Sequence, residues 1–142
     1  MPPFILRSDW YTEVTLQTGD SPNRVNPNLP GLYEWRIEGV GVYIGQYTNP
    51  SRPRKEYERN LRNKGSHKNY RLGKPNFRPI HESLFEWIDK AEITLTFLEN
   101  VDSKSERNRR EREVIQERRI SEANGGLRVL NGRRRIDSAK TA

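Results

Sequence analysis

The alternation of apolar and polar residues in the first third of the chain predicts a β-hairpin. Two runs, LYEWRI over residues 32–37 and VGVYIG over residues 40–45, are rich in β-branched and aromatic residues. Glu38-Gly39 lies between them and has the composition of a tight turn. Folding the two runs back on each other brings Tyr33 and Tyr43 to opposite or near-opposite positions. The pattern therefore predicts two phenol groups close together.

Two helices are predicted after the hairpin. The first covers RPRKEYERNLRN, with Ser51 as its N-cap and Pro53 tolerated in its first turn. The second covers FRPIHESLFEWIDKA and is amphipathic. Its apolar face consists of Phe77, Ile80, Leu84 and Ile88.

A third strand and a long charged helix follow. EITLTFLE alternates apolar residues with threonine, which is typical of a strand. The charged helix runs from Ser103 to about Ala123, where Asn124-Gly125-Gly126 ends it. WYTEVTL near the start could form a strand, and LRVLNG near the end is a short extended segment. The order β-β-α-α-β-α indicates an α/β sandwich, with a small antiparallel or mixed three-stranded sheet and helices packed against it.

The same pattern divides the chain into one domain with additions at its ends. The predicted parts are an N-terminal extension at residues 1–30, a domain at residues 31–131 that includes a basic loop insertion at 63–76, and a basic tail at 132–142.

Composition limits the chain to one modest core and favours an anionic partner. Of 142 residues, 32% are hydrophobic and 32% are charged, and the formal net charge is +7. The cations are mostly arginine, whose guanidinium group binds phosphates through two hydrogen bonds. Nucleic acid is therefore the expected partner. A solvated cationic surface without a specific partner is the alternative.

Other classes of protein are excluded by what the chain lacks. It has no cysteine, so disulfides, thiolate metal sites and a cysteine nucleophile are excluded. No apolar run approaches the roughly 20 residues needed to span a bilayer. The start MPPFILRSDW lacks the basic region and long apolar stretch of a signal peptide. We therefore expect a soluble cytoplasmic protein with no membrane partner.

Helical geometry singles out Glu111 in the charged helix. Val114 and Ile115 define the face that docks on the sheet, and at about 100° per residue Glu111 falls at the centre of that face. Glu113 points away from it. A carboxylate aimed into a core needs a cation, so we expect a metal ion or an arginine beside Glu111. Glu122 has the same azimuth but lies at the helix end, which makes it the weaker alternative.

The same geometry singles out Arg54 in the first helix. Tyr57 and Leu61 form the predicted buried face, and Arg54 lies within about 60° of it. Arg52 and Arg59 point outward. An arginine in a first turn beside the hairpin can contact a phosphate through its fork of donors. A surface arginine without such a role is the alternative.

Three further positions are candidates for binding. His81 lies on the apolar face of the second helix, as a hydrogen-bonded core residue or as a functional group. Arg78, at the edge of that face, either binds a phosphate or covers the surface. The strand-face neighbours of Tyr43 are Gly41 and Gly45, which form a bare strip where a backbone or a ligand can approach closely.

Taken in order, the two tripeptides of the hairpin and the later helices resemble the GIY-YIG nuclease family. Gly31-Leu32-Tyr33 is similar to the first motif, with leucine in place of isoleucine, and Tyr43-Ile44-Gly45 matches the second. The resemblance covers residues 31–131.

The resemblance also assigns roles to single residues. Arg54 resembles the catalytic arginine of the family, with Arg52 as the alternative because one or two inserted positions shift the comparison. Glu111, in the Glu-x-x-x-Ile pattern of EREVI, resembles the metal-binding glutamate. Asn131 resembles the asparagine that ends the module.

The resemblance implies a DNA endonuclease that depends on Mg²⁺ or Mn²⁺. In such an enzyme the paired tyrosines position or deprotonate the nucleophile, the arginine holds the phosphate and the glutamate binds one metal ion. The catalytic set is then Tyr33, Tyr43, Arg54 and Glu111, and the expected substrate contacts are Arg78, His81, Asn131 and Gly45.

Two other functional classes remain open from the sequence. One is a non-catalytic nucleic-acid-binding module on the same scaffold, and the other is an adaptor that binds protein partners through the charged helix. We also expect a homo-oligomer, at least a dimer, because one module carries one active site and a double-strand break needs two cuts. The first 30 residues are the preferred interface.

Overall fold

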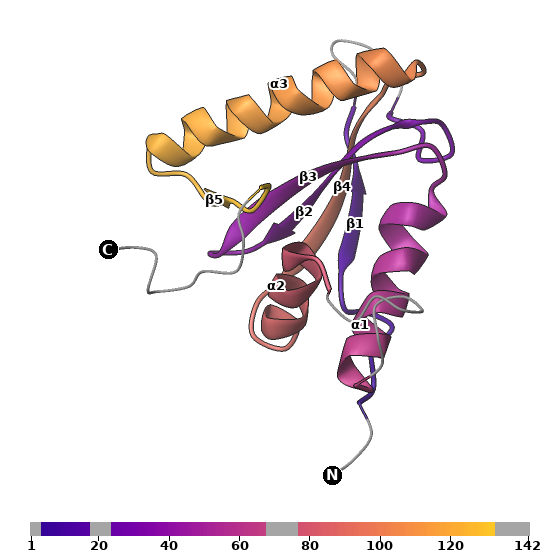
Figure 1. Ribbon diagram of the computed structural model, residues 1–142, viewed down its shortest axis with the longest axis vertical. Coiled ribbons are helices and arrows are strands. Elements are labelled where there is room, and N and C mark those ends of the chain that lie inside the picture. Colours follow the sequence, from indigo (N-terminus) through magenta and orange to yellow (C-terminus); the bar gives the residue numbers. More distant parts are fainter. Residues whose placement is uncertain (1–3, 18–23, 68–76, 133–142) are drawn as a thin grey trace.

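A computed structural model of the chain describes residues 4–17, 24–67 and 77–132, and shows a mixed five-stranded sheet with helices on both faces (Figure 1). The strand order is β1-β4-β2-β3-β5. The strands are β1 (Thr12–Thr15), β2 (Gly31–Ile37), β3 (Gly41–Tyr47), β4 (Ile93–Asn100) and β5 (Arg128–Val129).

The prediction of an α/β fold is confirmed, but the sheet has five strands and not the three that were predicted. The central strands β4, β2 and β3 are antiparallel and correspond to the three predicted strands. The two short edge strands pair in parallel, β1 with β4 and β5 with β3. The first 30 residues, expected as an extension, thus supply a strand of the sheet, and their Trp10 and Val25 are buried in its core.

The hairpin forms as predicted, with Gly39 in its turn at a φ of 75°. Such a positive φ favours glycine because it has no Cβ. Tyr33 pairs with Gly45, and Trp35 pairs with Tyr43. Since directly paired residues point to the same side of a sheet, both motif tyrosines lie on one face, two positions apart.

The helices are a π-helical turn η1 (Arg52–Glu56), which continues into α1 (Tyr57–Gly65), then α2 (Pro79–Trp87) and α3 (Lys104–Ala123). Ser103 caps α3 by accepting a hydrogen bond from the backbone N–H of Glu106. The predicted cap Ser51 does not do so for η1, because its backbone is already helical. Asn49 Oδ1 accepts the Ser51 N–H instead, at 3.0 Å. The described part of the predicted 63–76 loop is the end of α1 and residues 66–67, and the rest lies outside the described residues. No helix in the described ranges could cross a membrane.

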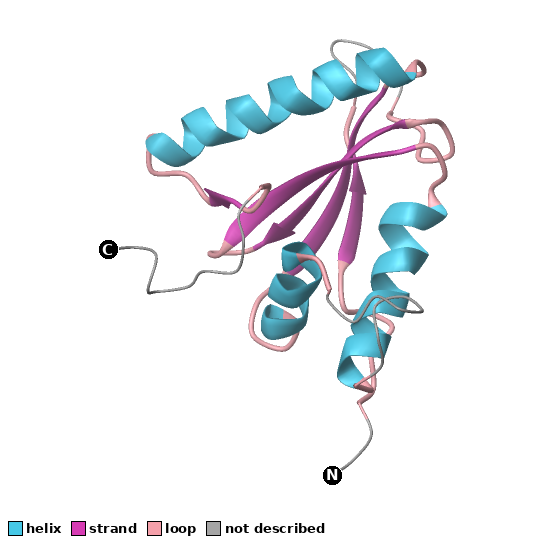
Figure 2. Cartoon of the chain, in the orientation of Figure 1, coloured by secondary structure: helices cyan, strands magenta, loops and turns pink. Residues whose placement is uncertain are grey.

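Two cores of unequal size lie on the two faces of the sheet. The face covered by α1 and α2 carries a large aromatic core, and the face below α3 carries a small one (Figure 2). The buried residues of the small core are Leu32, Ile44 and Val114. The apolar face predicted for α2 is confirmed, since Ile80, Leu84 and Ile88 are buried.

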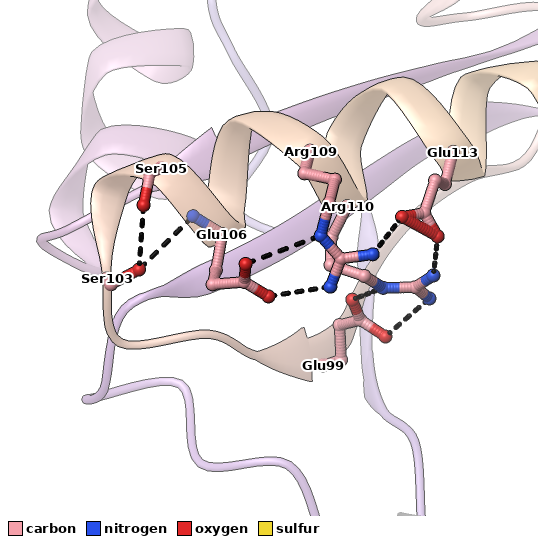
Figure 3. A network of polar contacts seen from close by, with 7 residues as sticks. All are labelled: Glu99, Ser103, Ser105, Glu106, Arg109, Arg110 and Glu113. Atoms are coloured by element: carbon pink, nitrogen blue, oxygen red, sulfur yellow. Dashed lines mark hydrogen bonds and ion pairs between the residues drawn. The ribbon is translucent and has the colours of Figure 1, made fainter.

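Ion pairs hold the first half of α3 and join it to β4 (Figure 3). Arg109 contacts both Glu106, at 2.6 Å, and Glu113. Arg110 donates two hydrogen bonds to Glu99 of β4, at 2.7 and 3.0 Å, and one to Glu113 at 2.8 Å. Much of the positive charge of this turn is therefore neutralised within the protein.

Candidate nuclease site at the β3 edge

Tyrosine side chains gather on the sheet face that α1 and α2 cover. The hydroxyl groups of Tyr33 and Tyr57 share a hydrogen bond of 2.8 Å, and both side chains are buried. Tyr43 lies on the same face of the sheet and is half-buried. The third phenol of this group is Tyr57 of α1. The sequence predicted that Tyr57 is buried but did not predict its hydrogen bond to Tyr33.

Burial controls the proton affinity of these phenols. It raises the pKa of Tyr33 well above the ordinary value, an effect that a negative charge on Tyr43 would increase, while Arg78 and Arg52 oppose it. Burial also raises the pKa of Tyr57. Tyr33 and Tyr57 therefore stay protonated at neutral pH and act through hydrogen bonds. Tyr43 is the phenol of this group that reaches solvent.

Arg54, the arginine predicted to hold the phosphate, is paired within the protein. Its guanidinium group donates two hydrogen bonds of 2.7 Å to the carboxylate of Glu13 in β1, and it lies 5.1 Å from the ring centroid of Phe97. Arg52, the alternative, is exposed and approaches a carboxylate, that of Glu56, only at 3.8 Å. Of these two arginines, Arg52 has the donor fork that is open to a phosphate.

Arg52 and Arg54 both lie in the π-helical turn η1 but face different neighbours. Arg52 is exposed, as the helical geometry predicts, and its charge acts on Tyr33, the partner of Tyr57. Arg54 is turned toward β1 instead.

Glu111 extends from α3 toward the end of β3, and its side chain is half-buried. Burial raises the pKa of its carboxyl group above the ordinary value, while a hydrogen bond from Gln46 and the charges of Arg112 and Arg52 lower it. Gln46 also donates to Asn108 Oδ1, at 2.7 Å, which fixes the amide beside the carboxylate. Glu111 thus has the partly buried position and the nearby cations that the helix face predicts.

These groups come from both faces of the sheet and meet at the edge of β3. Within the described residues, β5 pairs only with Gly41 and Val42, so no strand covers the edge of β3 beyond them. Arg52 follows the end of β3 and lowers the pKa both of Tyr33, on one face, and of Glu111, next to the other. The structure therefore brings the first motif tyrosine, an arginine and the predicted glutamate within electrostatic reach of one another.

The residues at this edge fit a magnesium ion that is shared with a substrate. The described part of the chain has no group of three or more acidic, histidine or cysteine side chains that could hold a metal ion alone. Mg²⁺ keeps several waters and commonly takes one or two carboxylates plus substrate phosphate oxygens. The desolvated carboxylate of Glu111, oriented by Gln46, is suited to that role.

Gly45 serves the packing of Tyr33. A Cβ atom at Gly45 would lie 2.3 Å from Cζ of Tyr33, and one at Gly41 would lie 2.8 Å from the carbonyl oxygen of Arg128 and 2.9 Å from Leu130. Of the two approaches expected at this bare strip, a backbone or a ligand, the structure shows the backbone of Arg128 at Gly41, while the Tyr33 ring fills the space at Gly45. Direct substrate binding at Gly45 is not supported by this geometry.

A substitution tests this packing. Gly45→Ala is expected to lower the free energy of unfolding by about 1–3 kcal/mol or more, because the added methyl group displaces the Tyr33 ring. Urea unfolding measures the change. In a Tyr33→Ala background the same substitution should cost much less, and an equal cost in both backgrounds would contradict the proposed contact.

Asn131 holds the main chain of the second motif. Its Oδ1 accepts the backbone N–H of Ile44 at 2.8 Å, and its Nδ2 donates to the carbonyl oxygen of Ile44 at 2.6 Å. The side chain thus takes the place of a strand partner at this edge. These two hydrogen bonds require a side chain that both donates and accepts, as asparagine does. A direct contact between Asn131 and a substrate stays a prediction.

His81 is a core residue, and Arg78 lies beside the tyrosines. The side chain of His81 is fully buried, and its Nε2 lies 3.0 Å from Nδ2 of Asn60. Burial lowers its pKa to about 3, and the charges of Arg78 and Arg59 act in the same direction. The buried, hydrogen-bonded imidazole fits the core residue that the sequence left open as one of two alternatives. Arg78 lies 5.9 Å from the ring centroid of Tyr57 and is the second cation of the tyrosine group.

The burial of His81 predicts a pH dependence of stability. Its folded-state pKa lies below the ordinary 6.5, so the unfolded chain binds the proton more tightly and stability should fall as pH drops from about 6.5 toward 5. Unfolding by urea across this range measures the loss. His81→Gln should flatten it, whereas a matching His67→Gln at an exposed position should not. Identical slopes for the two variants would contradict this role of His81.

A comparison of the chain with protein-family models, curated proteins and solved structures found no match. The case for a function therefore rests on the geometry of the β3 edge and on the two motifs of the hairpin.

Proposed function

We propose that this protein is a metal-dependent DNA endonuclease of the GIY-YIG type. One observation carries the proposal: the exposed Arg52 and the half-buried Glu111 both lie near the end of β3, where Gln46 of β3 donates a hydrogen bond to Asn108 of α3. Hydrolysis of a phosphodiester requires stabilisation of negative charge, an oriented water and, commonly, a divalent cation. The same small region offers a candidate group for each requirement.

In this proposal each side chain has a separate task. Arg52 binds the nonbridging oxygens of the scissile phosphate and stabilises the charge that develops there. Tyr43 orients the attacking water through its accessible hydroxyl. The buried, hydrogen-bonded pair of Tyr33 and Tyr57 supports the side of the site next to Tyr43.

Glu111 is the residue that would hold Mg²⁺ or Mn²⁺, with Gln46 orienting its carboxylate. A bound divalent ion supplies charge stabilisation and lowers the pKa of its water. Such help is needed because a phenol with an ordinary pKa near 10 is a poor base at neutral pH, and burial makes Tyr33 a weaker acid still.

The position of Glu111 also favours catalysis over binding alone. A module that only binds nucleic acid gains affinity from lysine and arginine at the phosphates. A carboxylate placed there repels phosphate unless a metal ion lies between them. A protein adaptor, the third class, has no need for a half-buried carboxylate at this edge.

Incubation of supercoiled plasmid with the purified chain, in Mg²⁺ and in EDTA, separates these classes. A nuclease nicks or cuts the plasmid only with the metal. A binding module retards it without cutting, and an adaptor does neither. Cutting of both strands would be the work of two copies. Assembly through the first 30 residues, where Val14 and Leu16 are exposed, stays a prediction.

A further inference from the structure

A groove with one basic wall runs along the outer side of α1. Its volume is about 790 Å³, and Phe4, Ile5 and Leu6 of the N-terminal segment form the opposite wall. The basic wall contains Lys55, Arg59 and Arg62, three exposed cations that follow each other at intervals of four and three residues. Arg59 and Arg62 lie on one side of α1, and Lys55 of η1 lines the same groove.

The cations of this groove are little neutralised by the protein. In the described ranges, Lys55 and Arg62 make no ion pair, and Arg59 approaches Glu56 only at 3.7 Å. The carboxylate that lines the groove, that of Glu58, accepts a hydrogen bond from Trp10 Nε1 at 3.3 Å.

The turn of α3 in Figure 3 shows the opposite pattern, because Arg109 and Arg110 both contact carboxylates there at short distances. Positive charge is thus available to an anionic partner along α1 and is largely satisfied within the protein at the start of α3.

The groove adjoins the candidate site. Glu56 lies between the two, 3.8 Å from Arg52 of the site and 3.7 Å from Arg59 of the groove. The groove and Arg52 are therefore neighbours, separated by a single carboxylate.

We propose that this groove binds the sugar-phosphate backbone of the DNA strand next to the bond that is cut. The proposal rests on the nuclease function for the identity of the ligand. Lys55 and Arg62 are seven residues apart, about 10 Å along a helix. One strand of B-DNA carries a phosphate every 3.4 Å or so of axis, so the three cations match about three phosphates. The exposed side chain of Ile5 offers the sugars an apolar contact on the other wall.

The salt dependence of DNA binding tests the proposal without any need for cleavage. The probe is a fluorescein-labelled duplex of about two helical turns, measured by anisotropy in EDTA between about 50 and 200 mM salt. Lys55→Ala/Arg62→Ala should weaken binding about 10-fold or more and reduce the slope of log K against log salt by about two. Arg109→Ala/Arg110→Ala removes the same charge from the neutralised turn and should leave the slope near the wild-type value.

A third variant should act in the opposite direction. Glu56→Gln removes the carboxylate between Arg52 and Arg59 and should strengthen binding, which a loss of folding cannot imitate. Equal slopes for the two double variants, or no gain from Glu56→Gln, would overturn the proposal. Thermal unfolding of each variant confirms that it is folded.

These results are independent of the plasmid assay. If the wild-type chain cuts DNA and both double variants bind DNA alike, the nuclease function stands and the proposed role of the groove is wrong. If the wild-type chain does not cut DNA but the two double variants differ in salt slope, the groove is a DNA-binding surface and the nuclease proposal is wrong.

Discussion

Replacing Glu111 with glutamine is expected to lower the rate of DNA cleavage about 10³-fold or more while leaving the fold and the affinity for DNA close to wild type. Glutamine preserves the shape and a hydrogen-bonding group beside Gln46, but it removes the negative charge that a divalent cation requires. Because the carboxylate is partly desolvated, its removal should not lower stability. Single-turnover cleavage of an end-labelled duplex in Mg²⁺ gives the rate, and anisotropy in EDTA gives the affinity.

Glu113→Gln is the matched control on the same helix. Glu113 contacts Arg109 and Arg110, and Arg110 in turn binds Glu99 of β4 (Figure 3). This variant should cleave within a few-fold of wild type. If Glu113→Gln abolished cleavage and Glu111→Gln did not, the assignment of the metal-binding carboxylate would be wrong.

Arg52→Ala is expected to lower the cleavage rate about 10²-fold or more, through the loss of charge stabilisation at the phosphate. Arg54→Ala should act mainly on stability, by about 1 kcal/mol, because it leaves the partly exposed carboxylate of Glu13 without its partner. Rates under single-turnover conditions, together with urea unfolding of both variants, separate the two effects.

The contrast between the two arginines is the informative result. A large loss of rate from Arg54→Ala with little change in stability would show that the pair with Glu13 opens when substrate binds. In that case Arg54 would be the phosphate ligand, as the sequence first predicted, and Arg52 would be a surface residue.

The features that the sequence predicted well depend on local periodicity. The turn at Gly39, the apolar face of α2 and the end of α3 before Gly125 each follow from residues close together in the chain. The run WYTEVTL does contain β1, but the parallel pairing of β1 with β4 joins segments distant in sequence and has no local pattern. The strand β5 is two residues long and pairs with the distant β3, so no local pattern distinguishes it from an extended loop.

The candidate site shows the same division. Tyr33, Tyr43 and Glu111 follow from hairpin pairing and from regular helical geometry, and both apply here. Helical geometry placed Arg54 correctly at the edge of the core, with Arg52 and Arg59 exposed. It could not show that Arg54 pairs with Glu13, because that carboxylate belongs to a strand distant in sequence.

Two further residues of the site were missed, for different reasons. Tyr57 carried a signal, since a hydroxyl group on a buried helix face needs a hydrogen-bond partner. Gln46 carried none. Its contact with Glu111 depends on how α3 packs across β3, which only the tertiary structure shows.

The plasmid assay, run with wild-type and Glu111→Gln chains purified in parallel, tests the proposed nuclease site most directly. The proposed site predicts that supercoiled plasmid is converted only by the wild-type chain and only in the presence of Mg²⁺ or Mn²⁺. Conversion by both chains would place the activity outside Glu111 or in a contaminating nuclease. Binding without conversion by a folded wild-type chain, across both metals, would contradict the assignment as a nuclease.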